Sequence, residues 1–167
     1  KYKIYPKKLR DKLLNFLNTL EVPIIITGGN SEIDFNIKKE IPSLSNIYNF
    51  IGETTLKDYF ILSKLSLAYI GMDTLNMHIA ASQNKRIFAI FGPTNLSMWA
   101  PWSNQFNSSI SLNKDIQSYG INTIFQANIN CVACGNKDCN GCGESECLEN
   151  INPKIVFEEI SNWYKNA

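Results

Sequence analysis

The sequence has 167 residues, of which 44% are hydrophobic and 19% are charged, a balance typical of a water-soluble domain with a sizeable core. Its 16 basic and 15 acidic residues leave a net charge of +1. With no basic stripe, this balance argues against duplex nucleic acid as a partner, because such binding depends mainly on neutralising phosphates. A small phosphate-bearing ligand held by backbone N–H groups remains open. No apolar run is long enough for a transmembrane segment.

Helices and strands are predicted to alternate along most of the chain. The first residue is Lys1 and a helix is predicted over residues 7–20, so we expect a piece of a longer protein. Short apolar runs predict strands at 22–27, 46–52, 65–71 and 86–92. Capping patterns and helical spacing predict further helices at 31–42, from 55, at 72–83, and from 152 to the end. Between 103 and 130 we expect one or two short strands.

Strands that are apolar throughout and alternate with amphipathic helices indicate an α/β fold with a parallel sheet covered on both faces. Ligands of such sheets bind outside the carboxyl ends of the strands. Glycine recurs at these ends, at Gly28, Gly52, Gly71 and Gly92. This pattern favours a ligand site, although glycine can also simply end a strand.

A polar cluster follows the third predicted strand, where Asp73, Thr74 and the single histidine, His78, lie within six residues. Thr74 is placed to cap the next helix, with Asp73 beside the positive end of that helix. The same helix N-terminus could hold a diphosphate, and His78 lies one turn further along the same face. Spacing alone does not decide between a capped helix and a ligand site.

The stretch from Gly71 to Trp102 resembles the donor-binding half of glycosyltransferase family 9, the ADP-heptose:lipopolysaccharide heptosyltransferases. The matching motifs are Asp73-Thr74, His78, Ala80-Ala81, Lys85-Arg86, Phe91-Gly92-Pro93-Thr94 and Trp99-Ala100-Pro101. Upstream, Lys3-Ile4-Tyr5-Pro6 is similar to the Lys-x-Trp-Pro motif of the family. The likeness spans nearly the whole chain.

The resemblance implies the C-terminal, Rossmann-like half of a GT-B enzyme, which binds the sugar nucleotide. The donor-binding residues it implies are Lys3, Gly28, Asp73, Thr74, Leu75, His78, Gly92, Pro93 and Thr94. No catalytic residue is expected in this chain, because the resemblance implies that the general base belongs to an acceptor domain, which we expect to lie outside these residues. The isolated chain is therefore expected to be inactive.

Three departures from the family pattern stand out. Leu75 replaces the glycine that follows Asp-Thr in the family, and Lys57, with Asp58 beside it, occupies the place of an acidic residue. The acceptor domain is expected to lie outside these residues, and the first strand of the donor-binding domain is expected to lie before Lys1.

The implied donor is ADP-heptose and the implied acceptor is the lipopolysaccharide core, with inversion at the anomeric carbon and no cofactor required. The resemblance also implies a cytoplasmic location, peripheral to the inner face of the bacterial inner membrane. One alternative is a family 9 transferase with another nucleotide-sugar donor. The other is a non-catalytic cysteine-cluster module on a Rossmann-like support.

Five cysteines form a C-x₂-C-x₄-C-x₂-C-x₄-C pattern between residues 131 and 147. Paired C-x₂-C units favour a metal, zinc first, over disulfides in a cytosolic enzyme. Family members commonly show four cysteines, which match Cys131, Cys134, Cys139 and Cys147. The expected organisation is a Rossmann-like domain at 1–130, a cysteine-rich segment at 131–150 and a C-terminal helix at 151–167 that packs on the same domain.

Overall fold

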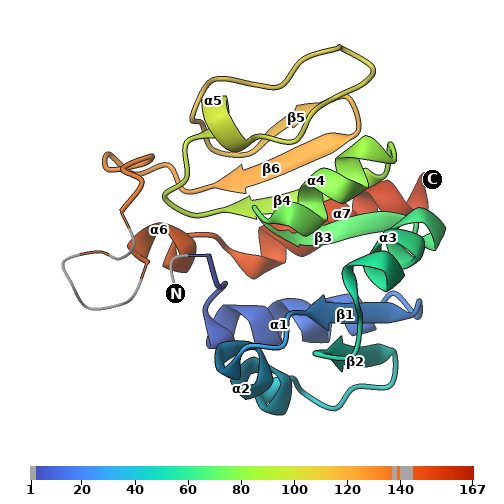
Figure 1. Cartoon of the computed structure of the whole chain (residues 1–167). Coiled ribbons are helices and arrows are strands. Elements are labelled where there is room, and N and C mark those ends of the chain that lie inside the picture. The colour runs from blue at the N-terminus through green and yellow to red at the C-terminus, as the bar shows by residue number, and fades with distance from the viewer. Residues whose placement is uncertain (1–2, 137–138, 140–144) are drawn as a thin grey trace. The chain divides into compact units, whose positions relative to one another are not determined.

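The computed structural model describes residues 3–136, 139 and 145–167, which fall into two compact units. The first unit contains the residues up to Pro6 and Leu62–Ile151. The second unit contains Lys7–Ile61 and Asn152–Ala167. Each unit has its own sheet, so each is described by itself (Figure 1).

The second unit has a two-stranded parallel sheet and three helices. Its elements are α1 (Lys7–Asn18), β1 (Ile24–Gly28), α2 (Glu32–Glu40), β2 (Ile47–Ile51) and α7 (Pro153–Lys165). The strands pair from Ile24 opposite Ile47 to Gly28 opposite Ile51. Helices α1 and α7 pack together, and the rings of Phe16 and Phe157 stack with centroids 5.4 Å apart.

Three of the predicted helix starts, at Ser31, Thr55 and Asn152, are capped as expected. Ser31 and Asp34 make a reciprocal capping box at the start of α2. Thr55 and Asp58 make the same contacts at the start of α3 (Leu56–Leu65), and Asn152 caps α7. Each cap satisfies backbone N–H groups that the first turn leaves without a partner, so these helix starts are determined locally.

The first unit is built on a four-stranded sheet in the order β3-β4-β6-β5 (Figure 1). Its elements are β3 (Ala68–Met72), α4 (Leu75–Ser82), β4 (Arg86–Phe91), α5 (Leu96–Trp99), β5 (Gln117–Tyr119), β6 (Asn122–Gln126) and α6 (Glu146–Glu149). Strands β3, β4 and β6 are parallel, and β5 runs antiparallel at one edge. Helix α3 crosses from the second unit into the first.

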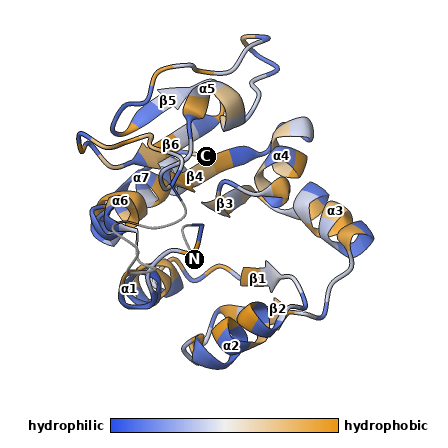
Figure 2. Cartoon of the chain, turned by 60° about the vertical axis from the view of Figure 1, so that its left-hand side comes forward, coloured by the Kyte–Doolittle hydropathy of each residue, from blue (hydrophilic) through white to orange (hydrophobic). Residues whose placement is uncertain are grey.

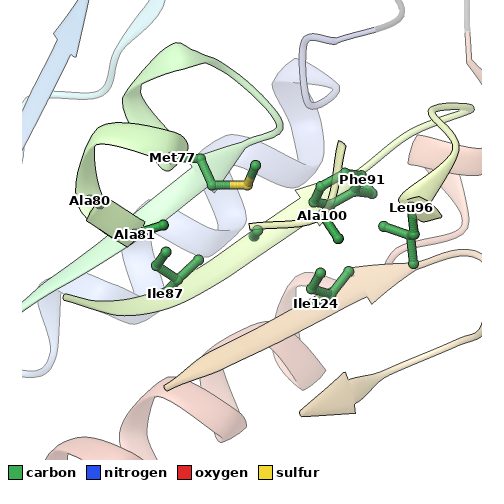
Figure 3. Close-up of a cluster of buried hydrophobic side chains, with 9 residues drawn as sticks. Met77, Ala80, Ala81, Ile87, Phe91, Leu96, Ala100 and Ile124 are labelled. Atoms are coloured by element: carbon green, nitrogen blue, oxygen red, sulfur yellow. The ribbon is translucent and has the colours of Figure 1, made fainter. Parts of the chain in front are cut away.

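Strand β4 is the centre of this unit, and it is drawn largely in the hydrophobic colour in Figure 2. Ile87, Phe88 and Phe91 are fully buried, as expected for a strand covered on both faces. On one face Met77 and Ala81 of α4 pack toward Ile87 (Figure 3). Because β4 is packed on both faces, it determines the position of the loop that follows its carboxyl end.

The structure confirms the predicted alternation of helices and strands and places two short strands, β5 and β6, where one or two were expected. Helices α5 and α6, each of four residues, were not predicted from the sequence. Among the described residues, no helix is both long and apolar enough to cross a membrane.

Tyr5 ties the N-terminal segment to the rest of the first unit. Its hydroxyl donates a 2.5 Å hydrogen bond to the carbonyl of Ile151, and burial raises the pKa of the phenol. We expect Tyr5→Phe to reduce the free energy of unfolding by about 1–3 kcal/mol, because it leaves a buried carbonyl without its donor. Urea denaturation measures this cost. The control Tyr48→Phe removes a hydroxyl from a side chain that is 48% exposed and should be nearly neutral.

Candidate functional site

The turn from β3 into α4 has an open helix N-terminus. Asp73 directly follows β3, and Thr74 occupies the N-cap position with extended backbone angles. The Thr74 hydroxyl accepts no hydrogen bond from the first turn, so the expected side-chain cap is wrong. It lies instead 3.4 Å from the Tyr69 hydroxyl. The helix N-terminus therefore keeps N–H groups available for an anion.

Lys3 supplies a positive charge at this turn. Its Nζ lies 3.0 Å from Asp73 Oδ2 and donates a 3.2 Å hydrogen bond to the Asp73 carbonyl. The Asp73 side chain is 1% exposed, whereas that of Lys3 is 34% exposed. A carboxylate so deeply buried needs a counter-charge, and Lys3 provides it. The ammonium also lies 5.5 Å from the ring centroid of Trp99, within the range of a cation–π contact.

His78 is half-buried on α4 and feels the charges of this ion pair. Burial lowers the pKa of His78, the Asp73 carboxylate raises it in part, and the Lys3 ammonium lowers it again. Its protonation state is therefore coupled to both members of the pair. The imidazole is biased toward its neutral form.

The loop from Gly92 to Thr94 lies at the same edge of the sheet. Met72 of β3 pairs with Ile90 of β4, so the residues after both strands emerge side by side. Gly92, Pro93 and Thr94 are all buried. The structure thus brings this predicted loop and the Asp73 turn to neighbouring positions at one sheet edge.

Four buried polar atoms at this edge lack hydrogen bonds to any described residue, namely Asp73 Oδ1 and Oδ2, Thr94 Oγ1 and Gln126 Oε1. Of these, Asp73 Oδ2 is compensated by its ion pair with Lys3. An unpaired buried polar atom costs roughly 1–3 kcal/mol, so such atoms are uncommon in folded proteins. A ligand that supplied hydrogen bonds here would recover this free energy.

Two other predicted residues have different surroundings. Gly28 ends β1 in the second unit, where a Cβ would come within 3.2 Å of the Ile51 side chain. Packing against Ile51 is therefore one reason for glycine at this position. Leu75 is the first residue of α4, and its side chain is 59% exposed.

The four cysteines of the predicted metal set differ in exposure. Cys131 and Cys134 are exposed, Cys139 is intermediate and Cys147 is buried beside Ser145. Within the described ranges, no three Cys, His, Asp or Glu side chains are grouped so that they could hold a metal ion. Cys142 lies outside the described residues. The zinc site stays a prediction from the cysteine spacing.

An open helix N-terminus beside a lysine, at the carboxyl edge of a parallel sheet, is a suitable place for the phosphates of a nucleotide. Comparison with known proteins identifies the class. The family model described as "Glycosyltransferase family 9 (heptosyltransferase)" matches residues 1–129. The chain belongs to glycosyltransferase family 9.

Curated relatives agree with this assignment. The chain is 26% identical over 95 residues to lipopolysaccharide heptosyltransferase 3 of Escherichia coli, a match to 55% of this chain and 28% of that protein. It is 25% identical over 105 residues to the protein of the same name from strain K12, covering 61% of this chain and 30% of the relative. These matches thus span under a third of each relative.

Solved structures share the fold. The structure of E. coli ADP-heptose lps heptosyltransferase II superposes with a TM-score of 0.66 and 20% identity, covering 99% of this chain and 44% of that one. The crystal structure of the glycosyl transferase family 9 protein from Veillonella parvula DSM 2008 superposes with a TM-score of 0.68 and 14% identity. This match covers 99% of this chain and 43% of that one. The expected α/β fold, that of half a GT-B glycosyltransferase, is confirmed.

The coupling of His78 to its neighbours predicts two opposite shifts. Asp73→Asn should lower the pKa of His78, because it removes a charge that favours the imidazolium. Lys3→Met should raise it, because it removes a charge that opposes protonation. His78 is the only histidine in the chain, so an NMR pH titration of its ring protons reports it without ambiguity. Shifts of the same sign would contradict the described arrangement.

Proposed function

We propose that this chain is the donor-binding domain of a heptosyltransferase-like enzyme, with ADP-heptose as donor and a sugar of the lipopolysaccharide core as acceptor. Membership of family 9 supports a glycosyltransferase. The observation that carries the donor site is the Lys3–Asp73 ion pair at the open N-terminus of α4.

The geometry of Lys3 supports a role in binding phosphate. Its ammonium has three N–H donors, and among the described residues its oxygen partners are Oδ2 and the carbonyl of Asp73. The third donor, on the ammonium that also lies near the Trp99 ring, could bond a phosphate oxygen, with the N–H groups of α4 nearby. Together they would neutralise negative charge that builds on the leaving ADP, so the transfer needs no metal ion.

Asp73 has a separate proposed role. Its Oδ1 is buried and has no hydrogen-bond partner among the described residues, so it can accept a bond from a hydroxyl of the donor sugar. Lys3 orients this carboxylate by its contact with Oδ2. On this proposal Asp73 distinguishes the complete donor from its nucleotide alone.

The acceptor side is proposed to lie outside this chain, which covers less than half of the solved family structures it matches. A base there would deprotonate the acceptor hydroxyl, and the sugar would transfer with inversion. We expect this chain alone to bind nucleotide without transferring sugar. A lipid-linked acceptor places the whole enzyme at the cytoplasmic face of the inner membrane.

Nucleotide titration tests the proposal. Calorimetry should detect ADP binding in the millimolar range, weak because half of the cleft is absent, with chemical-shift changes at Asp73 and Thr74. Lys3→Met should weaken ADP by roughly 10- to 100-fold, the loss of one charge-assisted hydrogen bond. Asp73→Asn should spare ADP but weaken ADP-heptose. UDP and GDP, titrated in parallel, test the alternative donors.

Two controls make the titration specific. Lys154→Met removes the same charge from an exposed side chain on α7 and should leave ADP affinity unchanged. The double variant Lys3→Met/Asp73→Asn avoids an unpaired buried carboxylate and should bind ADP as weakly as Lys3→Met. The absence of heat and of chemical-shift change with ADP would reject the proposed donor site.

Zinc at Cys131, Cys134, Cys139 and Cys147 is a separate proposal, based on cysteine spacing alone. If it is correct, purified protein should contain about one equivalent of zinc, and chelation should loosen residues 131–147 in hydrogen exchange. Elemental analysis without zinc, together with freely titratable thiols, would reject it. A protein that bound zinc and ignored every nucleotide would instead support the cysteine-cluster module.

A further inference from the structure

Gln126, the last residue of β6, holds the Gly92–Thr94 loop by its side-chain amide. The side chain is buried, and its Nε2 donates to the carbonyl of Gly92 at 3.3 Å and to that of Thr94 at 2.9 Å. The carbonyl between them, that of Pro93, accepts a 2.8 Å hydrogen bond from the Gly135 N–H. All three carbonyls of the loop are therefore bound by residues at or beyond the end of β6.

These contacts determine where the Thr94 N–H points. In a trans peptide the C=O and N–H groups point in opposite directions, and among the described residues only the Val132–Ala133 bond is cis. Because the Pro93 carbonyl is directed at Gly135, the Thr94 N–H is directed away from Gly135. The buried Thr94 Oγ1 on the same residue has no described partner.

The sheet register places this loop beside the ion pair. Phe91 pairs with Gln126 on one side, and β4 pairs with β3 through Ile90 and Met72 on the other. Asp73, Gly92 and the Gln126 side chain therefore belong to neighbouring positions along one edge of the first unit. The Gln126 side chain reaches this edge through its two hydrogen bonds to the loop carbonyls.

The geometry points to Gln126 as a positioning residue for nucleotide binding, acting through the loop without touching the ligand. It orients the loop so that the Thr94 N–H and hydroxyl face a phosphate of the nucleotide that Lys3 also binds. This inference deepens the proposed donor site and depends on it. Gln126 lies outside every motif that the sequence singled out.

The residue type supports a positioning role over simple packing. Both N–H donors of the Gln126 amide are used on the loop, while its Oε1 is buried without a partner among the described residues. An unpaired buried oxygen is a cost that an apolar side chain of similar size would avoid. The two hydrogen bonds to the loop, which an apolar side chain could not make, offset this cost.

The chain offers a matched control. Gln117 of β5 also donates through Nε2 to two carbonyls two residues apart, those of Leu112 at 3.0 Å and Lys114 at 3.4 Å. Gln117→Met therefore removes the same kind of bridge from a loop that no donor-site residue occupies. Gln126→Met removes the bridge under test, with nearly the same side-chain volume. Gln126→Asn keeps the amide but is one carbon shorter, so it cannot span both carbonyls.

The experiment measures ADP affinity by calorimetry, thermal stability, and the amide chemical shift of Thr94, all at a temperature where every variant is folded. Gln126→Met should weaken ADP by about tenfold, Gln126→Asn by less, and Gln117→Met not at all. The shift of the Thr94 amide on ADP addition should shrink in the same order. A role limited to stability would lower the melting temperature and leave affinity and the Thr94 response unchanged.

The outcomes separate the two proposals. If the wild-type chain binds ADP and Gln126→Met binds it equally well, the positioning role is overturned and the donor site stands. If Gln126→Met fails to fold, the comparison of Gln126→Asn with Gln117→Met decides by the same criterion. If the wild-type chain binds no ADP, the donor site and the role of Gln126 fall together.

Discussion

The pairing of the buried Asp73 carboxylate with Lys3 is the interaction on which the candidate site depends. The two residues are 70 positions apart in the sequence, and the Asp73 side chain is almost completely removed from water. An isolated charge in such a place is strongly unfavourable, so the N-terminal segment must return to the β3–α4 turn. Tyr5, two residues after Lys3 in the sequence, also holds that segment in place, because its hydroxyl donates a hydrogen bond to the Ile151 carbonyl. The contacts that hold the N-terminal segment in the first unit are thus also those that complete the candidate site.

The rest of the edge is held by hydrogen bonds to backbone carbonyls, made from elements that are themselves buried. Strand β4 is covered on both faces, so the position at which the loop after it begins is fixed by packing. The loop carbonyls are then bound by Gln126 and Gly135. With its carbonyls bound in this way, the loop can offer the Thr94 N–H and hydroxyl groups to a ligand. Such donors suit an anion.

Much of the fold could be predicted from local patterns, and the reasons are physical. Continuous apolar runs identified β4, and the caps at Ser31 and Thr55 identified helix starts, because each depends on neighbours in sequence. The strand β6 was harder to place, since Asn122 and Gln126 at its ends are polar although both are buried. Their burial depends on partners at Trp102 and the loop after β4, which no local window contains.

In the candidate site too, some residues were indicated by the sequence and others became visible only in the structure. Spacing placed Asp73 at a helix start but left its role open, and the resemblance to the family singled out Lys3. Their contact is a property of the tertiary structure, because no periodicity links residues so far apart. Gln126 had no sequence signal at all, since a single glutamine in a polar stretch has many surface equivalents. Its role becomes visible only when its burial and both hydrogen-bond acceptors are known.

The substitution of leucine for the family glycine after Asp73-Thr74 can now be judged on structural grounds. Leu75 begins α4, and its side chain is 59% exposed, so it takes no space from the buried core. Helix α4 begins directly after Thr74 although the family glycine is replaced. The Lys3–Asp73 pair forms beside this helix start. In the proposed donor site, the leucine side chain would narrow the approach to the open end of α4. The departure leaves the N–H groups at that helix end in place for the proposed anion.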